Sequence, residues 1–230
     1  MRNIVKELRP YYLGEGFNAK DLDEKVTLAD VRYGIATCGP GYRVEMFFQG
    51  CSRHCKGCFN VHLWSFKGAL TFPVADVLGM IDPTLDPGYY ANRDLATITI
   101  GGGEPFQQMD GLLALMRSIR KLEDYLGHPF HVIIYSGFTY EELWEGTPQT
   151  DRKMAREVLK LTNILIDGPY EEDKALMTSN SSFIGSWNQR YLILNKGKVA
   201  KEIGAIAANS DVGDIAKVHL LEAEREALSK

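Results

Sequence analysis

Three of the four cysteines in this 230-residue chain fall within eight positions. Cys51, Cys55 and Cys58 stand in the order Cys-Ser-Arg-His-Cys-Lys-Gly-Cys, a C-x3-C-x2-C spacing. Thiolates this close together in one loop can reach a single metal centre, and a cubane iron–sulfur cluster normally takes four cysteines. Three local cysteines would leave one iron without a protein ligand. By analogy with zinc sites, an open coordination position indicates catalysis rather than a structural role.

Two other interpretations of the cysteines stay open. A structural zinc site could use His54 or Cys38 as its fourth ligand, although zinc modules usually have a second, distant cysteine pair, which this sequence lacks. Three ordinary buried thiols are disfavoured by the spacing. Cys38 is most simply a small buried side chain. If it reached the cluster, it would close the open iron and indicate electron transfer.

Composition places the chain among soluble globular proteins. Hydrophobic residues make up 45% and charged residues 24%, which excludes a disordered chain. The net charge of −4 gives no basic field for nucleic acid, so we expect no nucleic-acid partner. No apolar run approaches the ~18 residues of a membrane helix, and the N-terminus lacks the apolar core of a signal peptide. We therefore expect a cytoplasmic protein with no membrane partner.

Apolar, β-branched runs alternate with helical patterns along the chain. Strands are predicted at residues 43–49, 97–100, 131–135, 163–166 and 190–194. Helices are predicted at residues 72–81, 109–126, 139–144, 152–161 and 214–228. This alternation predicts an α/β fold built from βαβ units around a parallel sheet. We expect an N-terminal extension at 1–34, one domain at 35–195, and a C-terminal tail with a surface helix at 196–230.

Polar or glycine-rich segments follow four of the predicted strands. The cysteines follow the first strand, and Gly101-Gly102-Gly103-Glu104-Pro105 follows the second. Ser136-Gly137 follows the third strand, and Asp167-Gly168 follows the fourth. Parallel α/β folds bind ligands at the carboxyl ends of their strands. The coincidence of four such breaks predicts a binding site at that edge.

The cysteine motif followed by Phe59 resembles the signature of the radical S-adenosylmethionine superfamily. Gly102-Gly103-Glu104-Pro105 resembles that family's GGE/DP motif. The resemblance implies a partial, open parallel β/α barrel in which Cys51, Cys55 and Cys58 hold a [4Fe–4S] cluster. It also implies that the open iron binds S-adenosylmethionine, whose reductive cleavage releases a 5′-deoxyadenosyl radical. In this interpretation Gly57 and Phe59 flank the adenine, while Gly102, Gly103 and Glu104 hold the methionine end.

A narrower resemblance covers residues 39 to about 194. It rests on five short motifs: Gly39-Pro40-Gly41-x-Arg43, Cys58-Phe59-Asn60-x3-Trp64, Tyr135-Ser136-Gly137-Phe138, Asp167-Gly168-Pro169-Tyr170 and Gly185-Ser186-Trp187-Asn188-Gln189-Arg190. In this order they resemble the activating proteins of anaerobic ribonucleotide reductases. That family forms a glycyl radical on its protein substrate, the anaerobic ribonucleoside-triphosphate reductase. An electron donor such as flavodoxin or ferredoxin is then implied.

Two strand-end residues are further candidates for cofactor binding. Ser136 stands in the third strand-end motif. The related pyruvate formate-lyase activases place a carboxylate near the position of Asp167, close to a monovalent cation, whereas a simpler role for Asp167 is to accept hydrogen bonds in a turn. Two alternatives to the activase remain. One is a radical enzyme acting on a small molecule, such as a 7-carboxy-7-deazaguanine synthase. The other is a non-enzymatic electron carrier with Cys38 as fourth ligand.

Overall fold

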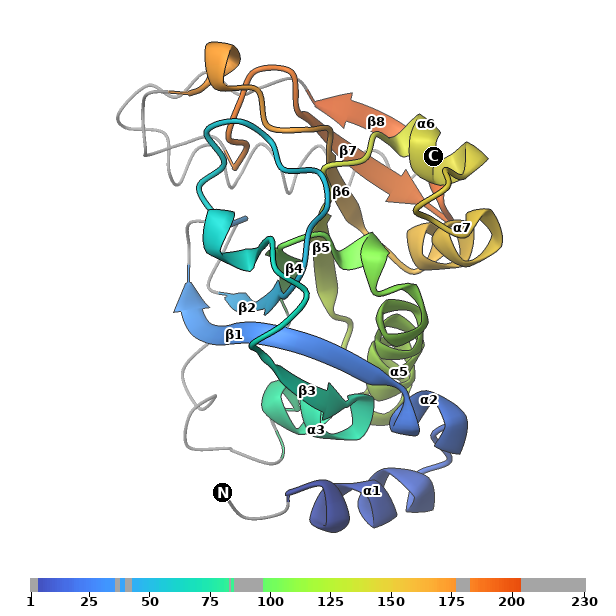
Figure 1. Cartoon of the computed structure of the whole chain (residues 1–230). Helices are drawn as coiled ribbons and strands as arrows, with labels where there is room; N and C mark the ends of the chain where they lie inside the picture. The colour runs from blue at the N-terminus through green and yellow to red at the C-terminus, as the bar shows by residue number, and fades with distance from the viewer. Residues whose placement is uncertain are drawn as a thin grey trace.

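The structure is a computed structural model that describes residues 4–35, 38–39, 43–82, 84, 97–176 and 183–203. Within these residues eight strands form one sheet in the order β3-β1-β2-β4-β5-β6-β7-β8 (Figure 1). The strands are β1 (Lys25–Ile35), β2 (Arg43–Phe48), β3 (Leu70–Pro73), β4 (Thr97–Gly102), β5 (His131–Tyr135), β6 (Ile164–Asp167), β7 (Arg190–Asn195) and β8 (Lys198–Ile203).

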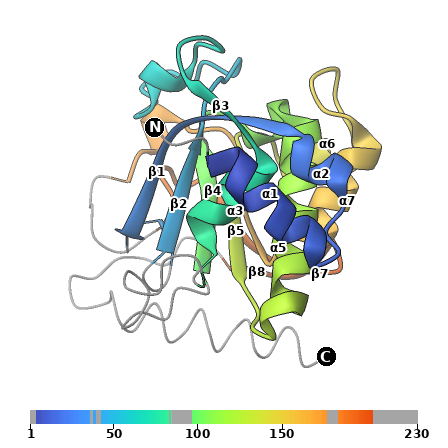
Figure 2. The ribbon, with the colours of Figure 1, turned by 90° about the horizontal axis from the view of Figure 1, so that it is seen from below.

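The helices are α1 (Ile4–Gly14), α2 (Ala19–Asp23), α3 (Val74–Ile81), α5 (Met109–Leu126), α6 (Tyr140–Glu145) and α7 (Arg152–Lys160). Three single-turn 3-10 helices accompany them: η1 (Val61–Leu63), η2 (Pro105–Gln107) and η3 (Glu172–Lys174). Figure 1 shows α5 and α7 together on one side of the strands, and Figure 2 shows α1 and α3 in front of the sheet beside α5. No described helix has the length and apolar character needed to cross a membrane.

The four central strands are parallel, as predicted. β2 pairs with β4, β4 with β5, and β5 with β6. Helix α5 connects β4 to β5, while α6 and α7 connect β5 to β6, so the predicted α/β class and βαβ units are confirmed. The predicted parallel sheet is correct for these central strands only, because β1, β3, β7 and β8 run antiparallel to their neighbours. The sheet is therefore mixed and open.

The antiparallel strand β7 follows from the chain that leads to it. Antiparallel neighbours need no crossover helix, whereas a parallel pair needs one of a dozen or more residues. The described residues between β6 and β7 contain only the single turn η3. A strand was predicted at 190–194 and is present, but its direction depends on this connection, which the strand pattern alone does not reveal.

The main core lies between the helices and one face of the sheet. Helix α5 presents a continuous apolar face of fully buried side chains: Leu112, Leu115, Met116, Ile119 and Leu122. Burying one such side chain stabilises the fold by about 1.5–3 kcal/mol. The helix ends at Gly127, which adopts φ +65°, a left-handed conformation that glycine accepts without strain. Predicted and observed bounds of this helix coincide.

A smaller apolar cluster covers part of the opposite face. Its members come from β5, β6, β7 and the segment just before β7: Ile133, Ile164, Ile166, Ile184, Tyr191 and Ile193. Both faces of the central strands are thus buried, which explains why these strands read as unbroken apolar runs.

The N-terminal segment supplies elements that the sequence pattern did not reveal. β1 pairs with both β2 and β3. Tyr12 and Leu22 are fully buried in the main core. The sequence around β1 alternates apolar with exposed polar residues, a weaker signal than the apolar runs of the central strands. The helix predicted at 214–228 lies outside the described residues.

Candidate active site

The cysteine loop runs from the end of β2 to β3 and is closed by backbone hydrogen bonds. The amide of Gly50 donates to the carbonyl of Leu63 at 2.8 Å, and the amide of Cys51 donates to that of Trp64 at 3.1 Å. Within the loop, the amide of Cys58 donates to the carbonyl of Cys55 at 3.1 Å. The cysteine segment is therefore a closed loop with defined geometry, anchored where β2 ends.

A cavity of about 490 Å³ lies beside this loop. Its lining includes Cys51, Cys55, Cys58, Phe59, Gly102, Gly103, Glu104 and Ser136. These residues come from the segments that follow β2, β4 and β5, and Gly168 adds the segment after β6. The structure thus brings together the strand-end segments that the sequence placed at one edge of the sheet. The volume lies within the range of about 300–1,000 Å³ typical of small-ligand sites.

The three thiols fit a cluster better than a single ion. Among the residues that the structure describes, no three His, Cys, Asp or Glu side chains surround one point as ligands of one metal ion. A four-iron cluster instead takes one thiolate on each ligated iron, so its cysteines are spread around the group. All three cysteines are free and partly accessible. The amide of Asn60 donates to the Cys58 sulfur at 3.3 Å.

Burial raises the pKa of the Cys51 thiol above its ordinary value, while hydrogen bonds from the backbone of Arg53 and His54 lower it. A thiol must lose its proton to bind a metal, so occupation of the site releases a proton.

The glycines after β4 lie directly against the start of the cysteine loop. Gly102 has φ +97°, and a Cβ there would come within 2.7 Å of the Phe48 nitrogen. A Cβ on Gly103 would come within 2.4 Å of the Gly50 carbonyl oxygen. The amide of Gly103 donates to the Phe48 carbonyl at 2.7 Å, and the amide of Glu104 donates to the Gly50 carbonyl at 2.8 Å. Only glycine fits here, so these residues hold the carboxylate of Glu104 next to the cysteines.

Glu104 is completely buried and lines the cavity. Its Oε1 accepts hydrogen bonds from the Ser136 hydroxyl at 3.0 Å and from the Phe106 amide at 3.1 Å, and its Oε2 accepts from the Gly137 amide at 2.7 Å. Burial raises the pKa of Glu104 to about 7, while these hydrogen bonds lower it. The carboxylate is fixed in place, and a cation in the cavity would favour its charged form.

Arg53 is a site residue that the sequence reasoning did not single out. Its guanidinium carbon lies 4.6 Å from the centre of the Phe138 ring, and its charge favours ionisation of Glu104. Gly137 makes room for it, because a Cβ at that position would come within 2.5 Å of the Arg53 side chain. The cavity therefore offers a carboxylate and a guanidinium side by side, which suits the ammonium and carboxylate of an amino acid. A basic residue between cluster cysteines is the signal that could have identified it.

Phe59 and Gly57, both predicted to flank an adenine, occupy different positions. Phe59 lines the cavity and is 73% exposed, with its ring in edge contact with Tyr170 at 5.2 Å between centroids. Gly57 is not among the cavity-lining residues. A Cβ there would come within 2.8 Å of a carboxylate oxygen of Glu172, which also pairs with Lys56 at 2.8 Å. Gly57 thus allows η3 to pack on the cysteine loop.

Asp167, the fourth strand-end candidate, lies outside the set of cavity-lining residues. It is fully buried, and its Oδ1 accepts from Arg190 Nε at 2.9 Å. Its Oδ2 accepts from Arg190 Nη2 at 2.5 Å and from the Tyr140 amide at 2.6 Å. Arg190 also pairs with Glu141 at 2.6 Å. These contacts tie β6 to β7 and to the start of α6, so Asp167 acts in this structure as a connection between elements.

The segment before β7 closes the far side of the cavity. Gln189 Oε1 accepts hydrogen bonds from the amides of Gly185 and Ser186 at 2.7 and 3.2 Å, while its Nε2 donates to the Gly168 carbonyl at 3.0 Å. Asn188 donates to the Pro169 carbonyl at 2.7 Å. The motif at 185–190 therefore holds two loops together and shapes the wall of the cavity.

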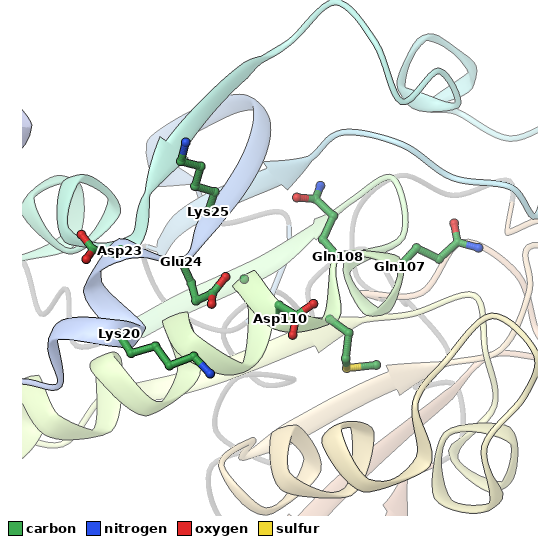
Figure 3. A pocket seen from close by; sticks show the side chains of 9 residues that line it. Lys20, Asp23, Glu24, Lys25, Gln107, Gln108 and Asp110 are labelled. Atoms are coloured by element: carbon green, nitrogen blue, oxygen red, sulfur yellow. The ribbon is translucent and has the colours of Figure 1, made fainter.

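A second hollow of about 770 Å³ lies at the start of α5 (Figure 3). Its lining mixes both signs of charge, with Lys20, Glu24 and Asp110 among its residues. Gln107 connects it to the cysteine loop by a reciprocal pair of hydrogen bonds with Ser52, at 2.9 and 2.5 Å. It contains no cysteine, and its polar residues support the loop from outside the first cavity.

Comparison with known proteins gives a family match over most of the chain. The model of a family described as "4Fe-4S single cluster domain" matches residues 37–192. A protein from Pasteurella multocida (strain Pm70) is 28% identical over 137 residues, covering 60% of this chain and 79% of that protein. One from Escherichia coli (strain K12) is 28% identical over 153 residues, covering 66% and 88%. One from Enterobacteria phage T4 is 23% identical over 157 residues, covering 66% and 84%.

All three relatives carry the name anaerobic ribonucleoside-triphosphate reductase-activating protein. Among solved structures, QueE from Escherichia coli matches with a TM-score of 0.38 and 17% identity, covering 60% of this chain and 58% of that one. This similarity is too low to indicate a shared fold or function.

Proposed function

This chain belongs to the family of 4Fe-4S single cluster domains, and from that membership we propose that it is a radical S-adenosylmethionine activase. Its protein substrate is an anaerobic ribonucleoside-triphosphate reductase, on which it forms a glycyl radical. The observation that carries the proposal is the single cavity that gathers Cys51, Cys55, Cys58 and Glu104. The name shared by the relatives supports the choice of partner.

In this proposal Cys51, Cys55 and Cys58 hold the [4Fe–4S] cluster, and the chain supplies no fourth ligand. When bound, the cluster and S-adenosylmethionine would supply one-electron reductive cleavage and hydrogen-atom abstraction from a glycine of the reductase. The residues around the cavity do not perform this chemistry. They bind, orient and shield the reacting groups.

The methionine end of S-adenosylmethionine fits beside Glu104 and Arg53. The carboxylate of Glu104 is aimed into the cavity by three donors and takes the ammonium, and the guanidinium of Arg53 is close enough to Glu104 to take the carboxylate of the same amino acid. Phe59 offers an exposed ring at the cavity rim for the adenine. Ser136 acts through Glu104, whose Oε1 it holds.

The access to the cavity suits a protein substrate. The parallel strands β2, β4, β5 and β6 form the curved wall of a partial, open barrel in this proposal, with the cavity on the face opposite the helices. A segment of the reductase enters from the open side and excludes water, which protects a reactive carbon radical. The electron donor is a flavodoxin or ferredoxin, and the reaction takes place in the cytoplasm.

Electron paramagnetic resonance of the anaerobically reconstituted protein tests the cofactor half of this proposal. The cluster is reduced with dithionite and its spectrum recorded before and after addition of S-adenosylmethionine, with 5′-deoxyadenosine measured in the same sample. We expect a changed cluster spectrum and 5′-deoxyadenosine. An unchanged spectrum without cleavage would indicate a closed cluster, as in an electron carrier. Zinc found in place of iron by metal analysis would indicate an interaction module.

A further inference from the structure

Polar residues other than the cysteines and Glu104 also line the cavity. Its lining includes Glu45, Arg32 and Cys38, together with the ring of Phe47. The functional roles described above use none of these four residues. Glu45 thus gives the cavity a second carboxylate in addition to Glu104.

Glu45 is an unusual residue for its position. It lies in β2, where Val44 and Met46 point into the main core and Glu45 points to the opposite face, because side chains alternate along a strand. It is only 5% exposed. Burial raises the pKa of Glu45 above its ordinary value. Burying a carboxylate is costly unless donors compensate it, so its retention inside a cavity calls for a function.

The partners of Glu45 within the chain are the Cys38 thiol and the charges of Arg32 and Arg43, which favour its ionised form. The thiol is a weak donor. Arg32 lies opposite Glu45 in the register of β1 and β2, but its Nε bonds Asp30 at 2.8 Å and its guanidinium stacks on Phe47 at 4.6 Å. The guanidinium of Arg43 donates to the Thr99 hydroxyl at 2.6 Å and to the Ile98 carbonyl at 2.7 Å. Glu104 accepts three hydrogen bonds from stronger donors than a thiol, so Glu45 has more capacity left for a ligand.

We propose that Glu45, with Arg32 beside it, binds the main chain of the reductase segment that carries the target glycine. This inference rests on the proposed function. A glycine has no side chain to recognise, so the segment around it offers main-chain N–H donors and carbonyl acceptors. A carboxylate and a guanidinium on neighbouring strands match one N–H and one carbonyl of an extended segment. Glu104 is occupied by the methionine ammonium, which leaves Glu45 for the peptide.

The test uses Glu45→Gln, which keeps the volume of the side chain and removes its charge. Binding of the reconstituted variant to the purified reductase of the same host is measured by biolayer interferometry without S-adenosylmethionine. Charge-assisted hydrogen bonds are roughly twice as strong as neutral ones, so we expect about five- to tenfold weaker binding. The number of 5′-deoxyadenosine molecules formed per glycyl radical should rise. Arg32→Gln should change both readouts in the same direction.

The matched control is Glu157→Gln, a change of the same type on α7, where Glu157 pairs with Lys160 outside the cavity. It should leave both readouts unchanged. The inference is overturned if Glu45→Gln binds the reductase like the wild type and gives the same product ratio. It is also overturned if Glu45→Gln instead loses affinity for S-adenosylmethionine in equilibrium dialysis, because Glu45 would then serve the cofactor. If the wild type formed no 5′-deoxyadenosine, the proposed function would fail, while the binding comparison would still decide the role of Glu45.

Discussion

The proposed pairing of Glu104 with the ammonium of S-adenosylmethionine predicts that binding of this ligand depends on pH in a defined direction. Burial raises the pKa of Glu104 to about 7 in the free protein. Below that pH the side chain is neutral and must lose a proton before it can pair with an ammonium. Affinity should therefore fall as the pH decreases below 7, by up to about tenfold per pH unit, and level off above it.

The substitution Glu104→Gln isolates this contribution. A hydrogen bond to a charged group contributes about 1.5–3 kcal/mol, and each 1.36 kcal/mol is a factor of ten, so the variant should bind S-adenosylmethionine roughly 10- to 150-fold more weakly at pH 7.5. The side-chain NH2 group of the glutamine would also face a hydrogen-bond donor instead of an acceptor. That donor is the Gly137 amide in one orientation of the side chain, and the Ser136 hydroxyl and Phe106 amide in the other. Because the variant lacks the titrating group, its affinity should depend less on pH than that of the wild type.

Equilibrium dialysis of the anaerobically reconstituted proteins between pH 6 and 8 measures both affinities. The ratio of wild-type to variant affinity removes the titration of the ligand itself, and we expect this ratio to increase with pH and to reach its plateau near pH 7.5. A ratio within twofold of one throughout the range would show that Glu104 does not pair with the ligand. A large ratio that does not change with pH would refute the raised pKa.

Four further substitutions test other parts of the structure. Cys55→Ala should abolish the visible absorbance and the iron content of the reconstituted cluster, whereas Cys38→Ala should retain both; loss of the cluster in the second variant would mean that Cys38 is a ligand. Gly103→Ala places a Cβ 2.4 Å from a carbonyl oxygen and should lower the free energy of unfolding by about 1–3 kcal/mol in urea titration, and an unchanged midpoint would contradict the tight packing there. Arg190→Met leaves the buried Asp167 without its cation and should lower the free energy of unfolding by about 3 kcal/mol in the same assay. A decrease below about 1 kcal/mol would show that Asp167 does not connect β6 to β7 through Arg190.

The central strands and the long helix could be predicted from the sequence because their patterns are local and unmixed. β4 and β5 are short β-branched runs bounded by glycine or polar residues, and α5 repeats one apolar face over 18 residues. The motif resemblance to the activating proteins agrees with the names of the relatives, and the iron–sulfur assignment agrees with the family match. These signals depend only on residues close together in the chain.

Other features depend on contacts that are distant in sequence. β1 is half exposed, and its strand structure is stabilised by pairing with β2 and β3 rather than by its own pattern. The direction of β7 depends on the connection that precedes it. Glu45 becomes a candidate site residue only when the sheet brings its segment to the cavity that the cysteines line. Spacing along the chain contains no information about that approach.

Formation of a glycyl radical on the reductase would be direct evidence for the proposed activity. The reconstituted and reduced protein is incubated anaerobically with S-adenosylmethionine and the reductase of the same host, and the electron paramagnetic resonance spectrum of the reductase is recorded. The Escherichia coli relative with its own reductase serves as the positive control. We predict a glycyl radical signal that requires all components and disappears when the target glycine is replaced by alanine or when Cys55→Ala protein is used. Formation of 5′-deoxyadenosine without any radical on the reductase, under conditions in which the control succeeds, would contradict the account.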